Sequence, residues 1–94
     1  MRTETVEIYS DQSNAAVMRH PGRKFPGVLI QGDTLYGMCV AADASCDKLR
    51  GSMDEDGYSE LNELRNHLWS LLTHYKSVLA AHEIQLPFGE SKGV

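Results

Sequence analysis

The stretch from Arg19 to Asp33 is the part of the chain best equipped for chemistry. Four basic or titratable side chains fall within six residues around a Pro-Gly turn, namely Arg19, His20, Arg23 and Lys24. Arginine binds phosphate or carboxylate through paired hydrogen bonds, and turn amides add further donors. With His20 and Asp33 as polar or acid–base groups, the stretch is one candidate anion site. The alternative is a solvated hairpin turn whose charges protect a sheet edge.

An acidic run, Asp54-Glu55-Asp56, is a second candidate contact surface. Such a run either meets a basic partner or is a solvated loop beside a helix start, where carboxylates favour the helix dipole. The run does not match the calcium-binding loop pattern in register, and no later Glu stands at the required place.

Trp69 is the only tryptophan, and helical periodicity places it off the apolar stripe of its helix. Arg65 lies four residues before it. An aromatic side chain on a polar helix face is typical of an interface anchor. The alternative is packing within the chain, on Phe88 or stacked on Arg65.

The remaining reactive residues form no recognisable catalytic or metal-binding pattern, so we expect no metal and no cofactor. His67 and His74 are seven residues apart, about 10.5 Å by helical rise and too far for one metal ion. The same spacing separates Cys39 from Cys46 and exceeds the ~7 Å limit for a disulfide. Both cysteines point at the predicted core, which predicts free, inert thiols. The balance leans against an enzyme.

Composition excludes several classes of protein. The net charge is −4 and the pI about 5.4, which disfavours a generic nucleic-acid binder because such proteins are basic. No apolar run approaches the roughly 20 residues of a membrane span, and the first residues lack a signal-peptide core. We therefore expect a cytoplasmic protein with no membrane association.

Local patterns predict three strands and two helices. Residues 5–9 alternate apolar and polar side chains, and 15–18 and 27–31 are short apolar runs separated by turn compositions. Asp33 is expected to cap a helix over 34–49, and Ser59 a longer helix over 60–83. The loop between them spans 51–57.

This order predicts a small α+β domain. Short connections favour an antiparallel three-stranded sheet, β-β-β-α-α, covered on one face by a two-helix hairpin. Residues 1–86 are expected to form a single domain, followed by a flexible tail over 87–94, because Pro87 bars helix continuation.

One string in the chain resembles a known kind of protein. Pro21-Gly22-Arg23-Lys24-Phe25-Pro26-Gly27, followed by Gln31-Gly32-Asp33, is similar to a mark of a family of small uncharacterised bacterial proteins. Proteins of this kind are often immunity or accessory proteins. In the physical interpretation of the string, Gly22 and Gly27 occupy special backbone positions and Phe25 lies in the core.

The leading hypothesis is a non-enzymatic interaction domain that binds another protein, or itself as a homodimer, through Trp69 and the acidic run. A rival hypothesis is a small anionic-ligand module or enzyme that uses the Arg19–Lys24 turn and Asp33. A third is a plain oligomer subunit.

Overall fold

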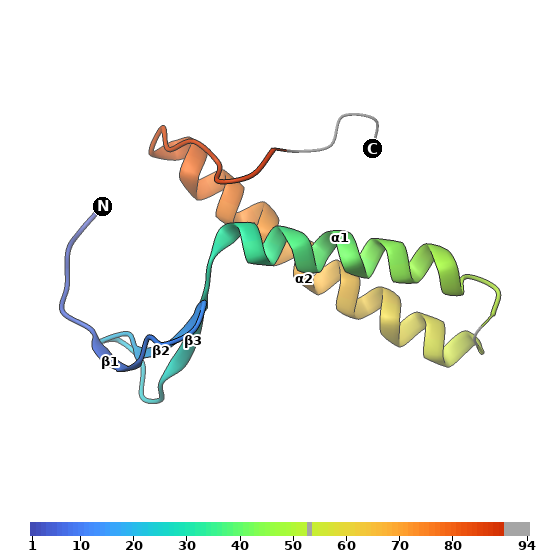
Figure 1. Cartoon of the computed structure of the whole chain (residues 1–94), viewed down its shortest axis with the longest axis horizontal. Helices are drawn as coiled ribbons and strands as arrows, with labels where there is room; N and C mark the ends of the chain where they lie inside the picture. Colours follow the sequence, from blue (N-terminus) through green and yellow to red (C-terminus); the bar gives the residue numbers. More distant parts are fainter. Residues whose placement is uncertain (53, 90–94) are drawn as a thin grey trace. The chain divides into compact units, whose positions relative to one another are not determined.

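The computed structural model describes residues 1–52 and 54–89. Three strands precede two helices (Figure 1): β1 (Glu7–Ser10), β2 (Ala15–Arg19), β3 (Gly27–Ile30), α1 (Gly32–Leu49) and α2 (Glu55–Ala81). The predicted α+β class and the β-β-β-α-α order are confirmed, as is the antiparallel sheet. The predicted cover of one sheet face by the helices stays a prediction.

The chain divides into two compact units at the end of β3. Unit 1 spans Met1–Gln31 and holds the sheet, and unit 2 spans Gly32–Val94 and holds the helices. The predicted single domain over 1–86 and flexible tail over 87–94 stay predictions, and residues 90–94 of that tail lie outside the described residues.

The strand register decides which side chains share a face of the sheet. In the antiparallel pair of β2 and β3, Met18 lies opposite Gly27 and Ala16 opposite Leu29. Between β1 and β2 the register shifts at Tyr9, where one extra residue forms a bulge. Because side chains alternate along a strand, Met18 and Leu29 lie on one face and Ile30 on the other.

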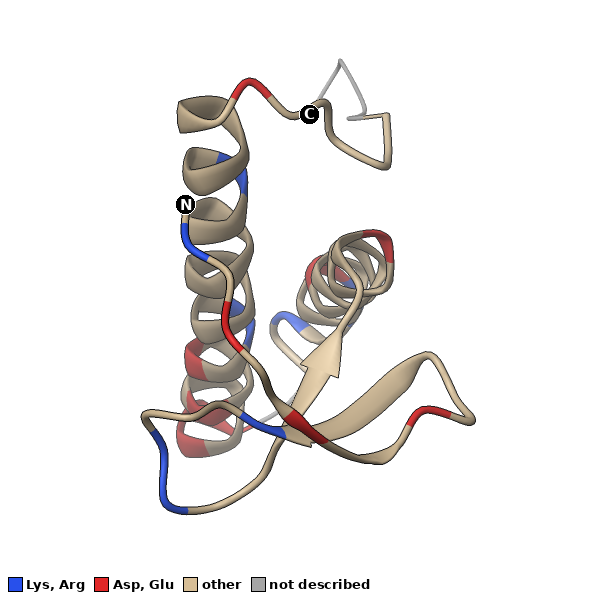
Figure 2. Ribbon diagram, turned by 90° about the vertical axis from the view of Figure 1, so that its left-hand side faces the viewer, with Lys and Arg blue, Asp and Glu red and all other residues tan. Residues whose placement is uncertain are grey.

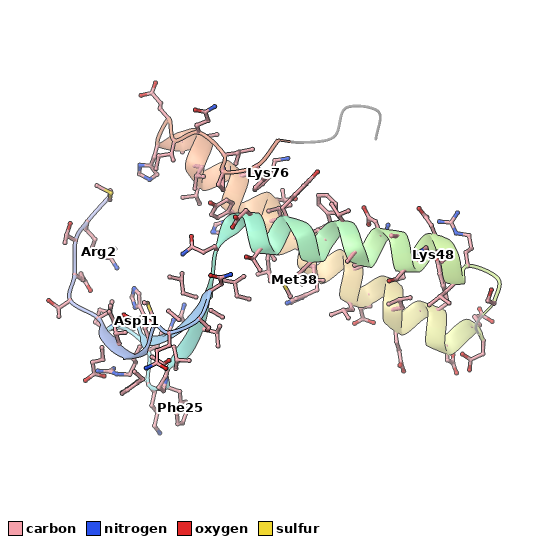
Figure 3. The ribbon with its side chains drawn as sticks, in the orientation of Figure 1. Arg2, Asp11, Phe25, Met38, Lys48 and Lys76 are labelled. Carbon is pink, nitrogen blue, oxygen red and sulfur yellow. The ribbon has the colours of Figure 1, made fainter. Side chains whose placement is uncertain are left out.

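Most of the apolar side chains of unit 1 are exposed. All of β1 and β3 is exposed, and β2 is half-buried. Phe25, expected in the core, is instead 73% exposed, and Figure 3 shows it extending outward from the turn after β2. That expectation was wrong because a 31-residue unit has too few side chains to enclose one. Gly22 and Gly27 also lack the positive φ that would make them special backbone positions, and Gly51 alone among the described glycines has one.

Both helices begin earlier than the sequence predicted. α1 begins at Gly32, so Asp33 lies in its first turn, where its carboxylate accepts a 2.9 Å hydrogen bond from the Thr34 amide. The cap of α2 is Asp54, whose carboxylate accepts a 2.9 Å bond from the Gly57 amide, and not Ser59. Asp54 is as good a cap as serine, and two acidic residues in the first turn add favourable interactions with the helix dipole.

The two helices pack against each other through a core of small and apolar side chains. Leu72 and Cys39 are fully buried, and Leu35 completes the cluster. Cys46 is buried as well, and both cysteines are free thiols, as predicted. The half-buried side chains packed around the cluster are Tyr36, Leu68, Trp69, Tyr75 and Phe88.

The segment after α2 returns to α1. α2 ends at Ala81, and Glu83 adopts a positive φ of 56° that turns the chain. The ring of Phe88 then stacks on Tyr36, with centroids 4.4 Å apart and an interplanar angle of 6°. This contact covers one side of the helix pair with an aromatic pair.

Within the described part of the chain, no helix is both long and apolar enough to cross a bilayer.

The contact between Gly32 of α1 and the Tyr75 ring of α2 gives a first prediction. A Cβ placed on Gly32 would overlap the Tyr75 ring, whereas a Cβ on Gly37, in the same helix, would meet nothing within 4 Å. We expect Gly32→Ala to lower the free energy of unfolding by about 1–3 kcal/mol, through overpacking. Gly37→Ala should raise it by about 0.5–1 kcal/mol, because alanine favours helix.

Urea unfolding followed by circular dichroism at 222 nm measures both variants. Equal effects of the two substitutions would contradict the tight contact between Gly32 and Tyr75.

Candidate functional site

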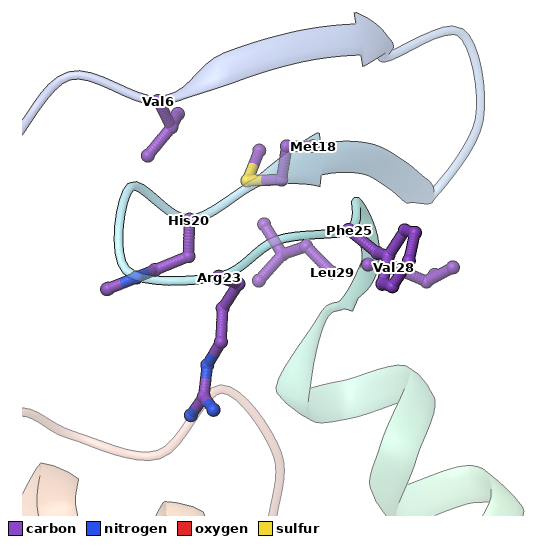
Figure 4. A pocket seen from close by; sticks show the side chains of 8 residues that line it. Val6, Met18, His20, Arg23, Phe25, Val28 and Leu29 are labelled. Atoms are coloured by element: carbon purple, nitrogen blue, oxygen red, sulfur yellow. The ribbon is translucent and has the colours of Figure 1, made fainter.

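Unit 1 carries an apolar pocket at its sheet, lined by residues that share a face with Leu29 and also by its neighbour Val28. The pocket has a volume of about 290 Å³ and is drawn in Figure 4. Its walls come from β2, β3, the turn between them and the residue before β1. The lining residues are Val6, Met18, His20, Arg23, Phe25, Gly27, Val28 and Leu29.

Two polar residues, His20 and Arg23, line the pocket, and hydrogen bonds within the turn hold the His20 ring in place. The Nδ1 atom of His20 accepts a 2.9 Å hydrogen bond from the Gly22 amide, and the His20 carbonyl accepts a 2.9 Å bond from the Arg23 amide. The ring proton of a neutral His20 therefore lies on Nε2, which leaves that atom as a donor. The Arg23 guanidinium extends outward from the turn (Figure 4).

Arg19 has a structural role. Its guanidinium pairs with the Glu7 carboxylate across β1 and β2, and Nη1 donates a 2.8 Å hydrogen bond to the Arg23 carbonyl. These bonds hold the turn and the first hairpin together. The Arg19 pairing, together with a hydrogen bond from Tyr9, lowers the pKa of Glu7, and the same carboxylate raises the pKa of Arg19. Arg19 is therefore committed to the sheet, unlike Arg23.

The other two members of the predicted anion site, Lys24 and Asp33, are not among the lining residues of the pocket. Lys24 places its Nζ atom 5.5 Å from the centroid of the Phe25 ring, a cation–π contact on the surface. Asp33 belongs to unit 2 and bonds the Thr34 amide. Of the predicted cluster, His20 and Arg23 line the pocket.

The acidic run begins α2. Asp54 is the cap, and Glu55 and Asp56 occupy the first turn. All three are exposed, and Figure 2 shows acidic segments along the first turns of this helix. Their placement at the start of α2 accounts for the run, because carboxylates there interact favourably with the helix dipole. A contact role for the run stays a prediction.

Trp69 is held inside the helix pair. Its Nε1 donates a 2.9 Å hydrogen bond to Asp43 Oδ1, and Arg65 Nη1 lies 3.6 Å from the same oxygen. The indole also packs against the core cluster. Phe88, one expected partner of Trp69, stacks on Tyr36 instead. Trp69 thus bridges α2 to α1, and its polar atom already has a partner.

Sequence reasoning missed the apolar lining of the pocket and the role of Asp43. The alternation of Val6 and Ile8, and of Met18 and His20, was the available signal for one shared face. Asp43 was an isolated carboxylate in a run of small residues, beside the apolar stripe of its helix. Only the pairing of two helices reveals what it binds.

Across residues 1–52 and 54–89, no group of three or more His, Cys, Asp or Glu side chains could hold a metal ion. Burial, followed by the charge of Asp43, raises the pKa of the Cys39 thiol. A raised pKa means less thiolate, which makes Cys39 a poor nucleophile.

A family model matches residues 1–88, which is nearly the whole chain, and its description is a family of unknown function, DUF6959. The chain belongs to the DUF6959 family. No curated protein and no solved structure matches it. The matched range includes the whole Pro21–Asp33 string, although the string as a mark of the family stays a prediction.

The Glu7–Arg19 pair predicts how the sheet of this DUF6959 member responds to acid. A carboxylate whose folded pKa is lowered adds stability above its ordinary pKa of 4.5 and loses it as the pH falls through the lowered value. We therefore expect pairing of β1 and β2 to weaken below pH 4.5. Hydrogen exchange of the β1 and β2 amides measures this, and Glu7→Gln should flatten that pH dependence. An unchanged pH profile in Glu7→Gln would show that other carboxylates cause it.

The bridge from Trp69 to Asp43 gives a further prediction. Asp43→Ala removes the acceptor and should cost about 1 kcal/mol in unfolding free energy. It should also shift Trp69 emission to longer wavelength, whereas Asp43→Asn, which keeps an acceptor oxygen, should do less.

Asp47→Ala is the matched control, because Asp47 lies one turn later on α1 and pairs only at the surface with Arg50, at 3.6 Å. Since Trp69 is the sole tryptophan, its emission reports this site alone. A shift in Asp47→Ala equal to that in Asp43→Ala would contradict the bridge.

Proposed function

We propose that this DUF6959 member is a non-enzymatic protein–protein interaction domain. Its sheet unit binds an apolar side chain of a partner protein in the pocket between Met18, Phe25 and Leu29. The observation that carries the proposal is this apolar pocket on an exposed sheet face. The immunity- or accessory-type role implied by the sequence resemblance stays a prediction.

The size and lining of the pocket suit a side chain of a protein partner. A volume of about 290 Å³ lies just below the range for small-molecule sites, roughly 300–1,000 Å³. Phe25 and Leu29 are exposed large apolar residues at its wall. Single anchors in such pockets supply much of the binding energy of protein interfaces.

The polar residues of the pocket, Arg23 and His20, indicate which chemical group of the partner lies beside its apolar side chain. Arg23 lines the pocket and is free of the pairing that commits Arg19 to Glu7. The His20 Nε2 atom is a second donor. A carboxylate next to the apolar anchor therefore fits best, because arginine binds carboxylates through paired hydrogen bonds.

The position of β3 supports an extended partner segment. Within residues 1–52 and 54–89, β3 is an outer strand that pairs with β2 only. An outer strand offers backbone donors and acceptors to another strand. Leu29, in the middle of β3, places the pocket beside that edge.

The lining supports binding over catalysis. Among the residues that line this pocket His20 is the only general acid–base candidate, and the lining has no carboxylate, serine, threonine or cysteine. Glu4 shares a neighbouring hollow with His20, and its carboxylate pairs there with Arg2. Nucleophilic catalysis commonly pairs a nucleophile with a base within hydrogen-bond reach, and the lining offers no such pair. The pocket therefore resembles a receptor for a side chain.

Selection of a displayed random-peptide library on the purified chain tests the proposal. Enriched peptides should carry a bulky apolar residue beside Asp or Glu. Leu29→Asp should weaken their binding by about 30-fold or more, the effect of losing an anchor contact, and Arg23→Ala by about tenfold.

Ile30→Asp is the matched control, because Ile30 is the next residue of β3, faces the other side of the sheet and is absent from the pocket lining. Equal loss of binding in Leu29→Asp and Ile30→Asp would contradict the pocket. Absence of enriched peptides, with phosphate raising the melting temperature through Arg23, would support the anionic-ligand hypothesis instead.

A further inference from the structure

α2 carries a line of large apolar side chains that nothing in the described structure covers. Leu64, Leu71 and Val78 are 56%, 50% and 40% exposed. They recur every seven residues, so they lie on one side of the helix, one above the other. Leu72, in contrast, is fully buried against α1.

This line is half of a heptad repeat. The second half, Leu61, Leu68 and Tyr75, is half-buried, and Leu68 and Tyr75 pack against the core cluster between the helices. The six positions alternate in steps of three and four residues, which is the spacing of a helix-packing seam. α1 therefore occupies one side of the seam, and the other side, formed by Leu64, Leu71 and Val78, is open.

The ends of the open line have complementary side chains. Glu60 precedes Leu64 by four residues, and His82 follows Val78 by four. Both are exposed. His82 is the cap residue directly after α2, and with the 100° periodicity continued to it both residues fall on the same strip as the apolar line. The strip thus has a carboxylate at its N-terminal end and an imidazole at its C-terminal end, equally distant from Leu71.

This symmetry identifies the partner. We propose that the open strip binds a second copy of this chain, with the two α2 helices antiparallel about a two-fold axis at Leu71. Leu71 then meets its own copy, Leu64 meets Val78, and Glu60 meets His82. A two-fold interface must be self-complementary in this way, and an imidazole N–H donates to a carboxylate in either protonation state.

Charge also sets the direction of the helices. The first turns of α2 are acidic, with Glu55, Asp56, Glu60 and Glu63 (Figure 2). In a parallel pair, the carboxylates at the start of one α2 helix would lie beside those of the other copy, and their negative charges would repel. The antiparallel pair separates the two acidic ends.

The size of the strip predicts a moderate affinity. From Glu60 to His82 it is about 33 Å long by helical rise. A strip of that length and about 12 Å width buries on the order of 800 Å² over both copies, below the ~1,000 Å² of stable interfaces. We therefore expect a dissociation constant in the micromolar range, about 1–100 µM.

Sedimentation equilibrium of the full chain tests the proposal. The mass should rise with concentration from one chain of 10.5 kDa towards twice that value. Leu71→Asp should weaken dimerisation by at least about 30-fold. Ser70→Asp adds the same charge one residue away, on an exposed position off the strip, and should leave the dimer unchanged.

Cysteine cross-linking tests the direction. Leu71→Cys should form a disulfide-linked dimer on mild oxidation, because only sites within ~7 Å can be bridged. Leu64→Cys alone should not, whereas a mixture of Leu64→Cys and Val78→Cys chains should. The wild-type chain is the control, since Cys39 and Cys46 are buried.

Three results would overturn the proposal. The first is a wild-type chain that stays monomeric up to about 1 mM, far above the expected constant. The second is a monomer whose unfolding free energy falls in Leu71→Asp, which would mean that the strip is covered within one chain. The third is cross-linking of Leu64→Cys alone, which would indicate a parallel pair. The test is separate from the pocket, because Leu71→Asp should leave peptide binding by unit 1 intact.

Discussion

This chain buries few side chains, and the rest of its structure depends on that constraint. Among the described residues only Leu35, Cys39, Cys46 and Leu72 form the buried apolar set. Conformational entropy opposes folding at roughly 1–2 kcal/mol per residue, and burial must offset it. So small a core leaves large apolar side chains in contact with water, and contiguous exposed patches mark binding surfaces. The pocket of unit 1 and the strip on α2 are the exposed apolar patches on which the two proposed interactions rest.

The close approach of α1 and α2 explains why the strip stays open. Small residues on α1, Gly32 and the two cysteines, let the helices meet tightly along one side. Tyr75 and Leu72 of α2 pack on the α1 side of the core cluster. The hydrogen bond from Trp69 to Asp43 adds a polar contact between the same two helices. A two-helix pair uses only one face of each helix. A 27-residue helix with apolar residues over a wider arc therefore keeps part of that arc unpaired.

The sequence was sufficient to predict the strands and helices and their order. It was insufficient to predict where the helices begin and which side chains are in contact. Strand alternation and helical periodicity are local signals, so the three strands and two helices followed from them. Asp54 and Ser59 are both competent caps, and propensity alone does not choose between them. In the structure Asp54 is the cap, and Glu55 and Asp56 in the first turn add favourable interactions with the helix dipole. The exposure of Phe25 and the bond from Trp69 to Asp43 depend on which surfaces meet, which no local pattern encodes. For the candidate site, His20 and Arg23 were predicted, while the apolar lining was missed because its members come from separate segments.

The two proposed surfaces lie on different units, and this has a consequence for affinity. A pocket that binds one side chain gives weak binding on its own, since association costs several kcal/mol of translational and rotational freedom. A dimer formed through α2 would carry two pockets. A partner that presents two matching segments within reach of both would gain from the second binding event without a new kind of contact, because that event is intramolecular. Modest affinity at the pocket and at the strip is therefore compatible with high overall affinity for a repetitive or dimeric partner. For the same reason, weak binding of a single peptide does not argue against an interaction role.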